Sequence, residues 1–320
     1  MLLSVVVVNW NSREDLRACL ASLRAQTDVT LEIIVVDNGS VDGSPEMVEA
    51  EFPEAVLLKQ SENLGFAEGC NRGIDASRGS WVALLNNDAT AEPGWARALV
   101  DEAEKAPPNC GMLQSLLLYQ DRPGVINSTG IELTYSGGGR DRDGGKLRQN
   151  SEPAADVFCP TGGAASYRRS MLDSIKLPRQ GLRSVVAASY FDPAHFMYYE
   201  DLDLGWRARL AGWTAQYVPQ SVVLHRWHGS SDRHGASWLT VVSCTNRLRT
   251  LLKNASLQFL VRTSPRTILE VGKVVWFGRI AAMVRLARAV RDSMALRARV
   301  DSMARIPRRA IERRWTAAPS

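Results

Sequence analysis

Two acidic segments of this sequence could do chemistry, and the first is Asn86-Asn87-Asp88, which carries a single carboxylate. It follows an apolar run over residues 81–85. Such a short run of large apolar residues is typical of a buried strand, and open α/β sheets bind ligands beyond the carboxyl ends of their strands. A carboxylate there can bind Mg²⁺ or Mn²⁺, and the cation in turn binds the phosphates of a substrate. We therefore expect Asp88 to anchor a metal–diphosphate site, while an ordinary turn is the alternative.

The second group is Glu200, Asp201 and Asp203, which follows an aromatic run and opens a helix that we expect to end at Gly212. The helix macrodipole stabilises carboxylates in a first turn, and this alone would explain one or two of them. It does not explain an aromatic run that leads into all three. A carboxylate can remove the proton of an attacking hydroxyl group. We therefore expect this group to hold a catalytic base.

The elements that must position these groups alternate along the chain. Apolar runs at residues 3–9, 31–37, 55–59 and 81–85 are separated by helical stretches. This alternation of strands and helices predicts an α/β fold with a mostly parallel, doubly wound sheet. The carboxyl ends of parallel strands meet at one edge, so Asn9, Asp37 and Asp88 should lie close together.

A Gly/Ser-rich turn follows the second strand. It carries Asp37, Asn38, Ser40 and Asp42. These groups can accept hydrogen bonds from the ribose hydroxyls or the base of a nucleoside, although a solvated Asx turn would have the same sequence.

A second glycine-containing segment carries Asn63, Gly65, Asn71 and Arg72. Glycine allows close approach of the backbone, and amides and arginine suit phosphate. The pattern is neither G-x-G-x-x-G after a strand nor a P-loop, which argues against dinucleotide and Walker-type sites.

The composition divides the chain into an acidic body and a basic tail. Residues 246–320 carry 17 Lys and Arg against 4 Asp and Glu, whereas residues 1–245 carry 22 against 30. The tail contains a basic amphipathic helix over residues 268–292, which is typical of helices at anionic membranes. Nucleic acid is the alternative partner, but aromatic residues are few in the tail and it holds no recognised motif. We expect a membrane surface and no nucleic acid.

The compartment is indicated by the cysteines and the first residues. The chain has five scattered cysteines without CxxC spacing, which favours a reducing environment. Residues 1–9 read as a strand and lack the features of a signal peptide. We expect a cytoplasmic protein that associates peripherally with the inner face of the cell membrane.

Four motifs together resemble those of the family-2 inverting glycosyltransferases, particularly the rhamnosyltransferase-like branch. They occur in order as Val7-Val8-Asn9-Trp10-Asn11, the turn from Asp37 to Ser44, Asn63-Leu64-Gly65-Phe66-Ala67 with its following glycine and asparagine, and Leu85-Asn86-Asn87-Asp88. The resemblance covers residues 3–228. It implies the GT-A nucleotide-diphospho-sugar fold.

The resemblance also implies residue roles. Asp37 would contact the nucleotide base and Asp88 would bind the metal. Asp201 would be the catalytic base, and Glu200 and Asp203 would position it or bind acceptor hydroxyls. His225 stands where relatives carry a metal- or pyrophosphate-binding histidine. The remaining nucleotide-sugar contacts would include Asn87 and the pair Gly162 and Gly163. This chain departs from the Asp-x-Asp pattern of many relatives, because Asn86 leaves a single carboxylate there.

We therefore expect an inverting glycosyltransferase. It would move a sugar, L-rhamnose from dTDP-rhamnose, to a hydroxyl of a lipid-linked saccharide in cell-envelope polysaccharide synthesis, with Mg²⁺ or Mn²⁺. Residues 1–245 would form the catalytic domain and residues 246–320 a membrane-associating helical extension. The alternatives are a nucleic-acid-binding protein and a sugar nucleotidyltransferase. The latter needs a glycine-rich basic loop after its first strand, where this chain has Asn9-Trp10-Asn11-Ser12.

Overall fold

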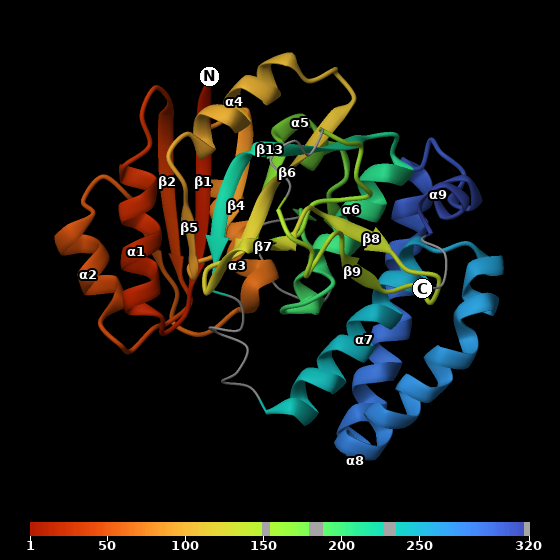
Figure 1. Ribbon diagram of the computed structural model, residues 1–320. Coiled ribbons are helices and arrows are strands. Elements are labelled where there is room, and N and C mark those ends of the chain that lie inside the picture. The colour runs from red at the N-terminus through yellow and green to blue at the C-terminus, as the bar shows by residue number, and fades with distance from the viewer. Residues whose placement is uncertain (149–153, 179–187, 227–234, 317–320) are drawn as a thin grey trace.

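The computed structural model describes residues 1–148, 154–178, 188–226 and 235–316 (Figure 1). Its centre is a mixed sheet with the strand order β3-β2-β1-β4-β10-β6-β13-β5, and β7 pairs with β6. The first half is parallel and confirms the predicted pattern. It consists of β1 (Leu2–Asn9), β2 (Thr30–Asp37), β3 (Val56–Lys59) and β4 (Trp81–Leu85).

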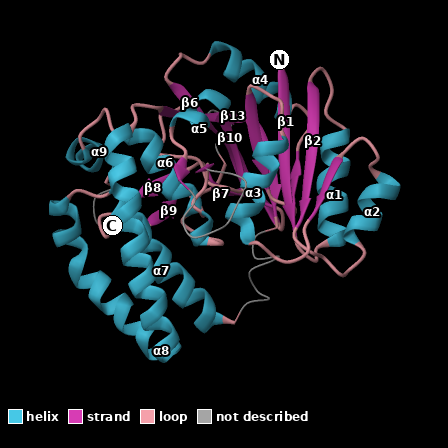
Figure 2. Ribbon diagram, turned by 180° about the vertical axis from the view of Figure 1, so that it is seen from behind, coloured by secondary structure: helices cyan, strands magenta, loops and turns pink. Residues whose placement is uncertain are grey.

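Helices cover both faces of this sheet, as Figure 2 shows. One face packs against α1 (Arg13–Arg24), α2 (Ser44–Glu51) and α4 (Trp95–Lys105), and the other against α3 (Gly65–Ala76), α5 (Arg169–Ser174) and α6 (Glu200–Leu210). In α1 the buried residues are Leu16, Cys19, Leu20 and Leu23, a spacing that places them on one helical face. The doubly wound arrangement is therefore set by apolar faces on local segments.

The second half of the sheet departs from the parallel pattern at β10 (Ala164–Arg168). This strand runs antiparallel between β4 and β6 (Cys110–Tyr119). Beyond it lie β13 (Thr214–His225), β5 (Ala89–Ala91) and β7 (Arg122–Ser128). Because β13 is parallel to β6, its carboxyl end lies at the same edge as the ends of β1 and β4. This edge brings together residues from three distant parts of the sequence.

Several short elements lie outside the main sheet. The five glycines in residues 137–145 predict a flexible loop, but this segment contains β9 (Gly139–Asp141), which pairs with β8 (Ile131–Leu133). The sequence also predicts one strand over residues 125–134, and in the structure these residues are divided between β7 and β8. The others are β11 (Leu177–Pro178), β12 (Ala188–Ser189) and the 3₁₀ turn η1 (Pro193–His195).

The C-terminal region forms α7 (Ala236–Asn254), α8 (Leu257–Met303) and α9 (Arg308–Trp315). Both halves of α8 lie against α7: Arg247 bonds to Glu270, and the carbonyl of Leu252 accepts from Arg297. Since a straight helix advances about 1.5 Å per residue, α8 must bend back to make both contacts. The predicted division at 245/246 falls inside α7.

The sequence predicts disorder beyond Pro307, but this is wrong for residues 308–315, which form α9. Ile311 is buried, and Glu312 accepts hydrogen bonds from the backbone and hydroxyl of Ser256 at 2.6 Å each. The ring of Trp315 lies 5.9 Å from that of Phe158. These contacts fix α9 on the body of the protein.

Candidate active site

A cleft of about 510 Å³ opens at the carboxyl edge of the sheet. Its walls come from the ends of β1, β4 and β13, from residues 161–163 and from residues 196–202. Both acid groups contribute to it. The expected site residues that line it are Asn9, Asn38, Asn63, Gly65, Asn87, Asp88, Gly162, Gly163, Glu200, Asp201 and His225.

Asp88 and His225 face each other on one side of the cleft. Asp88 Oδ1 lies 3.2 Å from His225 Nε2, and His225 Nδ1 lies 2.9 Å from Asn127 Oδ1. An amide oxygen only accepts hydrogen bonds, so Nδ1 carries a proton in this contact and Nε2 is the nitrogen that faces Asp88. Asn86 Nδ2 lies 3.3 Å from His225 Nε2.

This donor set fits a divalent cation, because a carboxylate oxygen and a neutral imidazole nitrogen are both metal ligands. Within the described ranges the side chains of Asp, Glu, His and Cys form no group of three or more that could hold a metal ion. Further ligands would therefore have to come from the substrate, from water or from other donor types.

Asp201 and Glu200 lie on the other side, at the start of α6. Asp201 Oδ2 accepts from the backbone N–H of Gly162 at 3.0 Å, and Oδ1 accepts from that of Leu202 at 2.7 Å. Burial raises the pKa of Asp201, and so does the charge of Asp141, while the two backbone hydrogen bonds lower it.

Glu200 is the more strongly perturbed of the two. Its pKa lies well above the usual range, mainly through burial and then through the charge of Asp201. Its Oε2 is buried and has no hydrogen-bond partner among the described residues. Burial without a hydrogen-bond partner favours the neutral form of Glu200, whereas two backbone hydrogen bonds stabilise the charged form of Asp201.

Two glycines connect the acid groups. The N–H of Asn86 donates to the carbonyl of Gly163 at 3.0 Å, and the N–H of Gly162 donates to Asp201. The backbone of residues 162–163 therefore links the end of β4 to the start of α6.

At the end of β1, Asn9 is held by its neighbours. Its Nδ2 donates to Asp37 Oδ1 at 3.2 Å, and its Oδ1 accepts from Asn87 at 2.8 Å. Asp37 also accepts from the backbone of Ser40, while Asp42 accepts from the backbone N–H groups of Arg13 and Ser44. Asp37, Ser40 and Asp42 thus organise the loop behind Asn9, and contact of Asp37 with a base stays a prediction.

Gly65 shows why the glycine-containing motif is needed. Its φ is +82°, and a Cβ there would lie 2.5 Å from Cδ2 of Phe196. The backbone conformation and the close packing both require glycine. The contact brings the start of α3 against the segment that leads into α6.

The structure corrects three expected site residues. Asn71 is fully buried, and its amide bonds to the backbone of Tyr190 and Phe191, so it supports a loop rather than a ligand. Arg72 pairs with Glu68 at 2.9 Å and lies outside the cleft lining.

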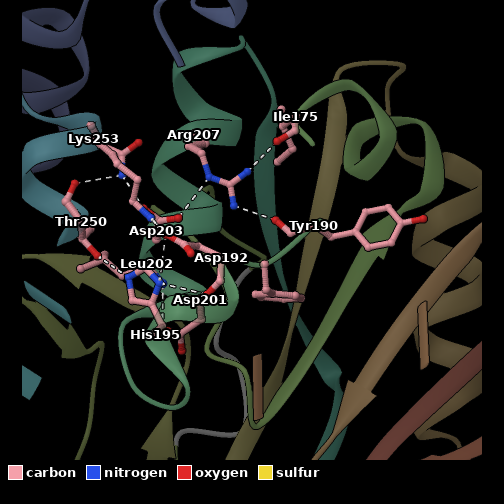
Figure 3. A network of polar contacts seen from close by, with 12 residues as sticks. Ile175, Tyr190, Asp192, His195, Asp201, Leu202, Asp203, Arg207, Thr250 and Lys253 are labelled. Atoms are coloured by element: carbon pink, nitrogen blue, oxygen red, sulfur yellow. Dashed lines mark hydrogen bonds and ion pairs between the residues drawn. The ribbon is translucent and has the colours of Figure 1, made fainter. Parts of the chain in front are cut away.

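Asp203 is the third correction. It is fully buried beneath the cleft, where it pairs with Arg207 at 3.1 Å and Lys253 at 3.0 Å (Figure 3). Asn254 donates to it as well, at 2.8 Å. These contacts, mainly with Lys253, hold the pKa of Asp203 below its usual range despite burial. A carboxylate enclosed in this way cannot bind an acceptor hydroxyl.

The sequence analysis missed Asn127 and Asp141. Asp141 lines the cleft from β9, within the segment that was expected to be a loop. Asn127 lies in β7, where a lone asparagine carries no recognisable signal. Three-dimensional placement alone identifies both.

Comparison with known proteins agrees with this geometry. Residues 4–176, more than half of the chain, match the model of glycosyl transferase family 2. A Mycobacterium tuberculosis N-acetylglucosaminyl-diphospho-decaprenol L-rhamnosyltransferase is 30% identical over 259 residues, which is 74% of this chain and 80% of that protein.

Solved structures show the same fold at low identity. The Pyrobaculum calidifontis mannosyltransferase with GDP-Man and Mn²⁺ has a TM-score of 0.52 at 16% identity, over 98% of this chain and 87% of that one. GalNAc-T7 with UDP, GalNAc and Mn²⁺ has a TM-score of 0.66 at 15% identity, over 93% and 55%. The S. aureus TarS fragment with UDP-GlcNAc has a TM-score of 0.53 at 17% identity, over 95% and 84%. The chain belongs to glycosyl transferase family 2: it is a glycosyltransferase with the GT-A fold.

Proposed function

We propose that this glycosyltransferase moves L-rhamnose from dTDP-rhamnose to a hydroxyl of a lipid-linked saccharide, with inversion, in the synthesis of a cell-envelope polysaccharide. The observation that carries the proposal is the cleft shared by Asp88 and Asp201. The donor and acceptor classes are supported by the M. tuberculosis relative, an L-rhamnosyltransferase named for a lipid-diphosphate-linked N-acetylglucosamine.

In this proposal Asp201 is the general base. It takes the proton of the acceptor hydroxyl as that oxygen attacks the anomeric carbon, and the bond from that carbon to the diphosphate oxygen breaks. Attack from the face opposite the leaving group inverts the anomeric centre. Glu200, protonated beside it, lines the same wall.

Asp88 and His225 would hold Mg²⁺ or Mn²⁺. The cation supplies positive charge that stabilises the departing nucleoside diphosphate. The Mn²⁺ in the mannosyltransferase and GalNAc-T7 structures supports this assignment.

We also propose that α8 contacts an anionic membrane surface at the inner face of the cell membrane. Trp276 is 81% exposed and Phe277 50% exposed. The exposed apolar residues around them are Ile268, Leu269, Val275, Met283 and Val284, with the exposed basic residues Lys273, Arg285, Arg288 and Arg291 close by in sequence. Apolar and basic side chains together suit an anionic bilayer surface.

Fewer basic residues of the segment 246–320 are available to contact a membrane than its charge suggests. Arg247 and Lys253 are buried and paired inside the protein. Among the described helices, none is both long enough and apolar enough to cross a bilayer. The proposed attachment is therefore peripheral and centred on the middle of α8.

The function is tested by a screen of nucleotide sugars with an N-acetylglucosaminyl-diphospho-lipid acceptor, with and without Mn²⁺ or Mg²⁺. The assay follows release of the nucleoside diphosphate and formation of the glycosylated lipid. We expect dTDP-rhamnose to give the fastest transfer, and Asp201→Asn to abolish transfer while dTDP binding stays nearly unchanged. Near-normal turnover by Asp201→Asn would show that another group is the base.

Membrane contact is tested by flotation with vesicles that contain phosphatidylglycerol. The double variant Trp276→Ser/Phe277→Ser should bind them more weakly, and Val41→Ser, which changes a 90% exposed residue far from α8 in sequence, is the control. Equal binding by the double variant and the wild type would refute this surface.

A further inference from the structure

The segment that leads into the catalytic helix has an unusual backbone. Phe196, Tyr198 and Tyr199 have φ values of 62°, 67° and 71°, a left-handed region that side chains other than glycine rarely adopt. All three residues line the cleft, and Glu200 and Asp201 follow directly. Strained backbone of this kind persists only where the surroundings hold it in place.

Asn246 on α7 holds this segment. Its side-chain Nδ2 lies 2.6 Å from the carbonyl oxygen of His195, 2.8 Å from that of Met197 and 3.0 Å from that of Tyr198. The residue is buried, at 2% exposure. One amide group therefore contacts three carbonyls of the strained turn, and the His195 carbonyl also accepts from the N–H of Met197 at 2.7 Å.

Three more residues of α7 continue the same polar face towards α6, and Figure 3 shows two of them, Thr250 and Lys253. Thr250 Oγ1 lies 3.1 Å from His195 Nε2, Lys253 pairs with both Asp192 and Asp203, and Asn254 donates to Asp203. Counted from Asn246, these residues are at i+4, i+7 and i+8, which places all four on one side of the helix.

The opposite side of the strained segment is fixed by α3. The N–H of Ala67 donates to the carbonyl of Phe196 at 3.1 Å, and the Phe196 ring packs on Gly65. From α7, Trp238 contacts the same ring edge to face, with centroids 5.9 Å apart. The segment is thus clamped between the nucleotide side of the cleft and α7.

We propose that the polar face of α7, and Asn246 above all, positions the carboxylates of Glu200 and Asp201 for transfer. Asn246 is a positioning residue: it acts through the backbone of residues 195–198. This inference rests on the proposed role of Asp201. It makes α7 part of the catalytic apparatus, although the matched family segment ends at residue 176.

The test is the Asn246→Ala variant of the full chain, with nucleoside-diphosphate release from dTDP-rhamnose in the presence of the lipid acceptor as the assay. Displacement of a reacting group by about 1 Å can cost about 100-fold in rate, so we expect kcat to fall about 10- to 100-fold. The donor KM and the Kd for dTDP should change by less than about twofold, because Asn9 and Asp88 are untouched. The acid limb of the pH–rate profile should move, since the surroundings of the base change.

Thr240→Val is the matched control for a second variant, Thr250→Val. The Thr240 hydroxyl donates to the carbonyl of Ala236 within its own helix, whereas the Thr250 hydroxyl faces His195. We expect Thr250→Val to lower kcat and Thr240→Val to leave it unchanged. If Asn246→Ala does not fold, this pair decides the question.

A folded Asn246→Ala protein with kcat within twofold of wild type would overturn the inference, and so would equal kcat values for Thr250→Val and Thr240→Val. Failure of the proposed function appears differently. In that case the wild type transfers no sugar, or Asp201→Asn stays active, whatever the α7 variants do.

Discussion

The Nδ1–H of His225 donates to Asn127 Oδ1 over 2.9 Å, and this contact decides which ring nitrogen faces Asp88. A hydrogen bond of this type orients a metal-binding histidine and keeps its other nitrogen unprotonated. Asn127 comes from β7, almost one hundred residues before His225. It therefore couples an edge strand to the proposed metal site.

Asn127→Ala should weaken Mn²⁺ binding about 10- to 100-fold, the usual effect of losing such a partner. Titration calorimetry with Mn²⁺ in the presence of dTDP measures this, with Asn109→Ala, at an exposed asparagine, as the control. Unchanged Mn²⁺ affinity in Asn127→Ala would contradict the assignment of His225.

Asp141→Asn should shift the acid limb of the rate profile to lower pH. The charge of Asp141 raises the pKa of Asp201, and a base works only when it is deprotonated. Removing that charge lowers the pKa of Asp201, so activity survives to lower pH. The control is Asp121→Asn, whose exposed carboxylate pairs with Arg122. A limb that stays in place, or moves to higher pH, would rule out this coupling.

Asp203→Asn should destabilise the protein, whereas Asp201→Asn should leave stability unchanged or raise it. Loss of the Asp203 charge leaves Arg207 and Lys253 in the interior without that partner, at a cost of about 3–5 kcal/mol in the free energy of unfolding. The pKa of Asp201 is raised by burial, so its charged form is unfavourable in the folded state. Urea unfolding at pH 7 compares the two variants. Equal losses would show that both carboxylates are structural.

His195 should make the folded protein sensitive to mild acid. Burial, and then the charge of Lys253, lower its pKa to about 4, whereas the unfolded chain takes up this proton near pH 6.5. Between these values the unfolded state binds more protons, so the free energy of unfolding falls as pH falls, by about 3 kcal/mol in all.

Urea unfolding of the wild type and of His195→Gln at pH 7 and pH 4.5 isolates this effect. The variant should lose less stability on acidification than the wild type does. Identical losses in the two proteins would mean that His195 titrates normally in the folded state.

Local signals predicted the first half of the fold. The run from Trp81 to Leu85 is fully buried as β4, and Asp88 lies beyond its end at the cleft. Here a strand and its functional residue are adjacent in sequence, so pattern and motif are enough. The same holds for Glu200 and Asp201, which open α6 as expected.

Residues whose role depends on distant partners could not be identified in this way. Asp203 resembles its neighbour Asp201 in sequence, but Lys253, fifty residues later, makes it structural. The sequence predicts that Asn71 binds a ligand, but its amide oxygen accepts hydrogen bonds from the backbone N–H groups of Tyr190 and Phe191. The sequence places Lys253 in the basic tail that is expected at a membrane, but its side chain is fully buried.

Lys253 pairs with both Asp192 and Asp203, and these ion pairs limit which sequence changes related enzymes can tolerate. A helix with a neutral residue at this position would leave two carboxylates facing each other without their cation. Exchange of C-terminal regions between relatives should therefore succeed only when residues 192, 203 and 253 are inherited together. The exposed middle of α8, which we propose contacts the membrane, can vary independently, whereas α7 must evolve together with the loop that it supports.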